Sequence, residues 1–146
     1  MSKSNAAETA FLTLVFNNTD WANIGDAGGL QNSASAGSLY VALHTADPGD
    51  AGTAATSECA YGSYARQAVA RSGAGWTVSG DTVSNAALIQ FPQCSSGSET
   101  ITYVSITTAS SGTSDILWSG ALSASLAVSS GIQPQFAIGA LTVTEA

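Results

Sequence analysis

The chain is poor in positive charge. Its 146 residues include 3 Lys+Arg against 10 Asp+Glu, a formal net charge of −7, and neither basic residue occurs after Arg71. Binding to nucleic acid depends on several basic side chains that displace counterions from the phosphates, and anionic membrane surfaces attract basic residues for a similar reason. We therefore expect neither nucleic acid nor a membrane surface as a partner.

Long hydrophobic runs are also missing. The longest, residues 10–16, is interrupted by Thr13 and is far shorter than the roughly 20 residues that a membrane-spanning helix needs. Lys3 is soon followed by Glu8, which does not match the charged start and apolar middle of a signal peptide. The sequence therefore predicts a protein that is made and kept in a cytoplasm.

Cysteine is nearly absent. Cys59 and Cys94 are the only two, too few for a disulfide scaffold and without the C-x-x-C spacing of a metal or redox site. We expect two buried thiols, with an intramolecular disulfide as the alternative.

Residues that carry acid–base chemistry are few. His44 is the only histidine, so every histidine-dependent triad or metal scheme would have to use it. The abundant serines form no G-x-S-x-G motif, and no phosphate-binding glycine motif occurs. We expect His44 to be structural or solvent-facing, and the chain to be neither an enzyme nor dependent on a cofactor.

The closest pair of carboxylates, Asp47 and Asp50, flanks a Pro-Gly corner. Aspartate is favoured at turns because its side chain bonds to the local backbone. A weak calcium site that adds Asp26 is the alternative, but the spacing lacks the D-x-D-x-D-G pattern of a calcium loop. We therefore expect a turn and no metal.

The first 37 residues predict a helix followed by a linker. Asn5 with Glu8 fits a capping box, and apolar residues then recur at helical spacing, while residues 25–37 are rich in Gly, Ser and Asn. The apolar face either packs on its own domain or docks on a neighbouring subunit. Its candidate interface residues are Phe11, Leu14, Phe16 and Trp21.

Residues 38–146 predict a β domain. Strand patterns bounded by Gly, Ser, Asn or Pro recur about every dozen residues, with no helical pattern between them. The fold class expected is mainly β: an antiparallel, jelly-roll-like β-sandwich with a short N-terminal helix. The predicted strands cover residues 39–45, 64–70, 76–78, 88–91, 101–108, 116–122 and 135–144.

Arg66 and Arg71 are the only arginines. Alternation along the predicted strand places Arg66 on the same face as Tyr64, and Glu58 lies shortly upstream. We expect Arg66, Glu58 and Tyr64 to be structural, with the guanidinium pinning a strand to a loop or to a partner subunit.

An ordered series of motifs resembles a family of small virion proteins of tailed bacteriophages, often labelled tail fibre proteins. The motifs are LYVALHTADPGDAG at 39–52, ECAYGSYARQ at 58–67, WTV at 76–78, NAALIQFP at 85–92 and ITYVSI at 101–106. The resemblance covers residues 39–144 and carries no catalytic motif.

The resemblance implies a head decoration, or cement, protein with a jelly-roll-like fold. Such a protein is made in the bacterial host cytoplasm and binds the capsid exterior as a homo-oligomer, dimer or trimer, clamping copies of the major capsid protein. The expected contacts are the N-terminal interface residues and the loop around Asp47 and Asp50.

Two other functions remain open. One is a tail fibre or tail-associated module that binds a receptor or glycan through loop aromatics. The other is a glycan hydrolase, for which the sequence offers no obvious pair of catalytic carboxylates.

Overall fold

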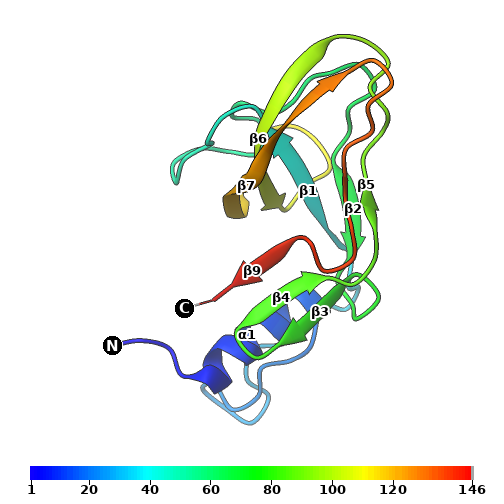
Figure 1. The fold of residues 1–146 in the computed structure, drawn as a ribbon. Coiled ribbons are helices and arrows are strands. Elements are labelled where there is room, and N and C mark those ends of the chain that lie inside the picture. Colours follow the sequence, from blue (N-terminus) through cyan, green and yellow to red (C-terminus); the bar gives the residue numbers. More distant parts are fainter. Residues whose placement is uncertain (146) are drawn as a thin grey trace. The chain divides into compact units, whose positions relative to one another are not determined.

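The computed structural model describes residues 1–145 as one helix and nine strands (Figure 1). No helix in this part of the chain is long and apolar enough to cross a membrane. The elements are α1 (Asn5–Asn17), β1 (Ser38–His44), β2 (Gln67–Ala70), β3 (Trp76–Ser79), β4 (Thr82–Asn85), β5 (Ile89–Gln90), β6 (Ser98–Thr107), β7 (Ile116–Ser129), β8 (Gln135–Phe136) and β9 (Thr142–Thr144).

The strands form separate sheets. A four-stranded sheet has the order β2-β1-β6-β7, a three-stranded sheet has the order β3-β4-β9, and β5 pairs with β8. The registers of β1 with β6, β6 with β7, β3 with β4 and β4 with β9 are all antiparallel. The prediction of a mainly β, antiparallel fold with a short N-terminal helix is confirmed, and separate sheets fit the sandwich-like arrangement expected.

The chain divides into two compact units. One comprises Met1–Ser38, Val69–Leu88 and the stretch from Phe136 onward, and the other comprises Leu39–Ala68 and Ile89–Gln135. We call them the helical unit and the sheet unit. The proposed boundary between residues 37 and 38 stays a prediction, because units defined by contacts are not a test of independent folding.

In the helical unit, α1 packs on β3 and β4. Leu12, Phe16 and Trp76 are fully buried, and the rings of Phe16 and Trp76 meet edge to face with centroids 4.9 Å apart. Lys3 pairs with Glu145 and so joins the two ends of the described chain. The apolar face of α1 therefore packs within its own unit.

The N-cap of α1 differs from the expected capping box. Ser4 is the N-cap, and its hydroxyl accepts from the Ala7 N–H. Asn5 is already the first helical residue. The prediction was one residue late, because Ser and Asn are both good N-caps and stand side by side here.

The neighbouring strands β1 and β6 contribute buried apolar side chains to the core of the sheet unit. Val41 and Leu43 of β1 are buried, as are Ile101 and Ile106 of β6. Val41 stands opposite Ile106 in the register. The same sheet positions the polar cluster described below.

Several strand predictions were wrong in detail, and two of them are instructive. β4 was not predicted, because its inward positions are Val83 and the polar Asn85. Asn85 is satisfied by the Leu141 N–H and the Ala87 and Ala137 carbonyls. The single strand expected over residues 135–144 is divided into β8 and β9, with Gly139 at φ +75° between them.

Candidate functional site

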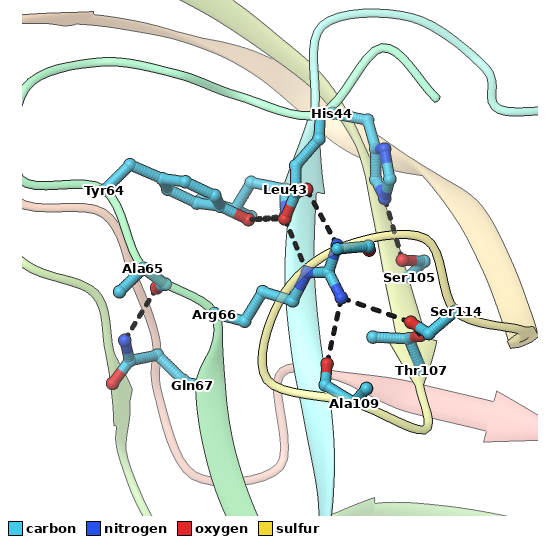
Figure 2. A network of polar contacts seen from close by, with 12 residues as sticks. Leu43, His44, Tyr64, Ala65, Arg66, Gln67, Ser105, Thr107, Ala109 and Ser114 are labelled. Atoms are coloured by element: carbon cyan, nitrogen blue, oxygen red, sulfur yellow. Dashed lines mark hydrogen bonds and ion pairs between the residues drawn. The ribbon is translucent and has the colours of Figure 1, made fainter. Parts of the chain in front are cut away.

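Arg66, directly before β2, is the centre of the most connected polar cluster in the sheet unit (Figure 2). Its side chain is only 1% exposed. A guanidinium has five N–H donors, and the contacts of Arg66 supply an acceptor for each. They are Glu58 Oε1 to Nε at 2.6 Å, Glu58 Oε2 to Nη2 at 2.8 Å, Gly112 O to Nη2 at 2.7 Å, Ala109 O to Nη1 at 2.9 Å and Ser114 Oγ to Nη1 at 3.2 Å.

Glu58 faces Arg66 with both carboxylate oxygens. A β-bridge between His44 and Glu58 places this residue beside β1, and the Cys59 N–H donates to the Leu43 carbonyl at 2.9 Å. A two-pronged pair of this kind fixes direction as well as distance. The hydrogen bond to Glu58 and its charge raise the pKa of Arg66 against the opposing effect of burial.

Tyr64 joins the ion pair to β1. Its hydroxyl donates to Glu58 Oε1 at 3.1 Å and accepts from the Leu43 N–H at 3.0 Å. The ring stacks on Phe91 at 6.2 Å between centroids. Burial raises the pKa of Tyr64 well above its ordinary value, so the hydroxyl remains a donor at any physiological pH.

The turn before Tyr64 explains part of the ECAYGSYARQ motif. The Tyr64 N–H donates to the Tyr61 carbonyl, and Ser63 has a left-handed φ of 76°. A Cβ at Gly62 would lie 2.8 Å from the Ser96 backbone nitrogen, which is too close. Gly62 therefore lets this turn approach residues 95–96, and the turn directs Tyr64 and Arg66 back toward β1.

The remaining acceptors of Arg66 lie in the loop between β6 and β7. The hydroxyls of Ser114 and Thr107 are hydrogen-bonded to each other at 2.7 Å. The Ser114 carbonyl accepts from the Ala54 N–H. Arg66 thus holds residues 109–114 against the segment that carries Glu58. The structure brings together the three residues predicted as structural, Arg66, Glu58 and Tyr64, and adds this loop, which the sequence analysis missed.

His44, at the end of β1, is fully buried. Its Nδ1 lies 2.9 Å from the Thr56 carbonyl and its Nε2 lies 2.7 Å from Ser105 Oγ. A carbonyl only accepts, so we assign the proton to Nδ1 and let Nε2 accept from the Ser105 hydroxyl. Burial lowers the pKa of His44, and the Thr56 hydrogen bond opposes this.

Burial limits the chemistry of this pair. Ser105 is 1% exposed and His44 is 0% exposed, so a substrate has no surface from which to reach the hydroxyl. The serine–histidine hydrogen bond therefore links β1 to β6. We call Arg66 with its acceptors a brace, because it holds two segments of the chain together.

Cys59 and Cys94 are both free and buried. Burial, reinforced by Glu99 and Glu58, raises the pKa of Cys59 to about 12. Since the thiolate is the nucleophile, this thiol is inert at neutral pH.

The candidate interface residues of the N-terminal segment differ in how far they are buried. Phe11, Leu14 and Trp21 are half-buried, and Trp21 forms a bridge with Leu30. The expectation that Phe16 lies on a docking face is corrected here, because Phe16 is fully buried against Trp76.

Asp47 and Asp50 are exposed in the loop after β1. Asp47 Oδ1 accepts from the Gly49 N–H at 2.9 Å, the local turn bond that aspartate favours. Among residues 1–145 no group of three or more His, Cys, Asp or Glu side chains is arranged to hold a metal ion.

Arg71 is a second brace that the sequence analysis did not anticipate. Its Nε donates to the Val15 carbonyl at 2.6 Å and its Nη2 to the Leu14 carbonyl at 2.8 Å. These carbonyls belong to the last turn of α1, where acceptors have no partner within the helix and a positive charge is favoured. Arg71 Nη1 also reaches Ala36 O and Ser33 Oγ at 3.2 and 3.3 Å.

Comparison with models of known protein families identifies the family of this chain. The model of the family described as podophage GP4 fiber I protein gp80 matches residues 2–144. The chain belongs to this family. It is therefore a structural protein of a phage virion.

The family match covers both units and both arginine braces. The family description supports the tail-fibre alternative better than the capsid decoration that the sequence analysis placed first. No curated protein sequence matches the chain.

Proposed function

We propose that the chain is a non-enzymatic structural module of a phage tail fibre. The observation that carries this proposal is the family match over residues 2–144, whose description names a podophage fiber protein.

The placement of the reactive groups supports a structural role. The histidine and its serine partner are buried, and Arg66 has every donor satisfied within the chain. Buried groups with all their hydrogen bonds made within the chain stabilise a fold and have no donor left for a substrate.

A fibre module holds other proteins in fixed positions and transmits force between them. Rigid loops at its surface would support this role. The Arg66 cluster ties residues 109–114 to the segment of Glu58, and Arg71 ties the end of α1 to residues 33–36. We expect the two braces to keep loop surfaces in one conformation, which lowers the entropy lost on assembly.

The partners proposed are other virion proteins and further copies of the chain. The exposed turn of Asp47 and Asp50 is the candidate contact loop, and Trp21 and Leu14 are half-buried candidates in the helical unit. Charge reversal at Asp50 should weaken attachment without changing the melting temperature, because this carboxylate is exposed. Reversal at Asp47 should also weaken attachment, but it removes the turn bond from the Gly49 N–H and should lower the melting temperature slightly.

The test is to add the purified protein to separated tails and to separated heads of virions that lack it, and to measure cosedimentation with each. Saturable binding to tails, and not to heads, is the result expected. Binding to heads would restore capsid decoration as the function, and hydrolysis of host glycans by the free protein would contradict a non-enzymatic role.

A further inference from the structure

The segment that follows α1, residues 18–33, closes on itself, and we call it the Trp21 loop. The Trp21 N–H donates to the Leu30 carbonyl and the Leu30 N–H donates to the Trp21 carbonyl, both at 2.9 Å. At the base of the loop, the Asn18 side-chain amide donates to the Ser33 carbonyl and its oxygen accepts from the Ser33 N–H, again at 2.9 Å. The loop therefore takes its shape from hydrogen bonds of its own.

Both carboxylates of the Trp21 loop help to hold it. Asp20 Oδ1 accepts from the Asn32 N–H at 2.7 Å, and Asp26 Oδ1 accepts from two successive glycine N–H groups at 2.8 and 3.1 Å. A Cβ at Gly29 would lie 2.0 Å from the Trp21 carbonyl oxygen, so glycine is required at this approach. Both aspartates are exposed, and neither forms an ion pair within residues 1–145. Each keeps a charge that can face a partner.

The same loop exposes apolar side chains. Ile24 is 40% exposed and Leu30 is 45% exposed. Trp21 is half-buried, and its bridge with Leu30 places the two side chains next to each other, because opposite residues of an antiparallel pair share a face. Apolar groups grouped at a surface are typical of binding sites, and a loop already held in shape loses little entropy on binding.

Charge indicates which partner fits this loop. An apolar centre flanked by two carboxylates is complemented by an apolar surface flanked by basic residues. This chain has only three basic side chains, and all of them already have partners. Lys3 pairs with Glu145, and Arg66 and Arg71 donate to acceptors within their own units. A second copy, itself of net charge −7, therefore lacks the complementary chemistry.

We propose that the Trp21 loop docks on a different virion protein, one that presents an apolar surface flanked by lysine or arginine. Trp21, Ile24 and Leu30 contact the apolar surface, and the two aspartates face the basic side chains. The inference rests on the proposed function for the virion as the source of the partner, but it does not depend on whether that partner belongs to the tail or to the head.

The first test measures the dissociation constant on separated tails and separated heads of virions that lack the chain, using whichever particle the unaltered protein saturates. Trp21→Ala should raise the constant roughly a hundredfold, because aromatic anchors carry much of the energy of an interface. Ile24→Ser, at an exposed position, should raise it roughly tenfold without lowering the melting temperature. The matched control is Leu88→Ser, an exposed leucine of the helical unit outside the loop, which should leave binding unchanged.

A second test removes charge and keeps the hydrogen bonds of the loop. The double variant Asp20→Asn with Asp26→Asn retains an acceptor oxygen at both positions. It should raise the dissociation constant roughly tenfold and make binding less sensitive to salt. The control Asp81→Asn removes an exposed carboxylate from the turn between β3 and β4, and it should change neither quantity.

The possible results separate this proposal from the proposed function. Tail binding that ignores Trp21→Ala and Ile24→Ser, or that does not weaken with salt, would overturn the docking proposal and leave the tail-fibre function standing. Head binding that both variants weaken would support the loop and contradict the tail-fibre function. Binding to neither particle would contradict both, and self-association that Trp21→Ala abolishes would identify a second copy as the occupant and overturn the proposal.

Discussion

The helical unit and the sheet unit each depend on one arginine, but the two arginines are held differently. Arg66 is almost wholly buried and faces a carboxylate in addition to carbonyls. Arg71 is half-buried and bonds to carbonyl and hydroxyl oxygens at the end of α1 and in the following loop. A charge removed from water needs an opposite charge, whereas one that keeps some hydration is sufficiently stabilised by backbone dipoles.

The difference indicates which brace tolerates change. Loss of Arg66 would leave the Glu58 carboxylate without its opposite charge and two backbone carbonyls without this donor in a confined space. Loss of Arg71 would return helix-end carbonyls to water. We therefore expect the sheet unit to depend on its arginine more strongly than the helical unit does.

The largest effect is expected for Arg66→Met. Removing one partner of a buried ion pair costs about 3–5 kcal/mol, so urea unfolding should show a loss of that size in the free energy of unfolding. The double variant Arg66→Met with Glu58→Met should recover part of it, because no unpaired charge remains. A loss below about 1 kcal/mol in the single variant would contradict the role given to Arg66.

Lysine substitution should separate the two braces. Arg66→Lys keeps the charge but cannot reproduce the planar, two-pronged contact with Glu58, and we expect a loss of about 2 kcal/mol. Arg71→Lys should cost less than about 1 kcal/mol, because one ammonium still reaches a helix-end carbonyl. Equal losses in thermal or urea unfolding would remove the distinction.

Arg71→Met should lower the free energy of unfolding by about 1–2 kcal/mol, because it removes the helix-end charge and its hydrogen bonds.

The two buried thiols lie in the sheet unit, so their labelling reports on the opening of that unit alone. Labelling of Cys59 and Cys94 by a thiol reagent should speed up in Arg66→Met and stay slow in Arg71→Met. Faster labelling in Arg71→Met alone would reverse the comparison.

The smallest effect concerns pH. Burial lowers the pKa of His44 below its ordinary 6.5, so the unfolded chain binds a proton more readily than the folded one. The stabilising contribution is fully present above pH 6.5 and is lost as the pH falls below it, by at most about 1.4 kcal/mol per pH unit. His44→Asn should flatten this part of the profile of unfolding free energy against pH, and an unchanged slope would contradict it.

The sequence predicted the elements whose patterns are regular. β1 was expected over residues 39–45 and spans Ser38–His44. The prediction was close because Leu39, Val41 and Leu43 alternate along the sequence. β4 was missed, since the inward Asn85 is polar and is satisfied by the nearby Ala87 carbonyl and the distant Ala137 carbonyl. β7 was expected to end at residue 122, but pairing with β6 extends it to Ser129 through a Ser/Ala run that lacks strand patterning.

The candidate site was predicted only where side chains contact side chains. Glu58, Tyr64 and Arg66 are close in sequence, and their chemistry indicates a pair. The acceptors in residues 109–114 and at the end of α1 are mostly backbone carbonyls, which every residue carries and no motif identifies. Phe16 was misplaced for a related reason: apolar residues on a helix face do not reveal whether the partner is Trp76 or another chain.

The most direct test of the account is cryo-electron microscopy of virions that carry this chain with a small fused domain as a marker. We expect marker density at the tail fibres and at no other position. Marker density arranged over the head lattice would contradict it and identify the chain as a capsid decoration protein.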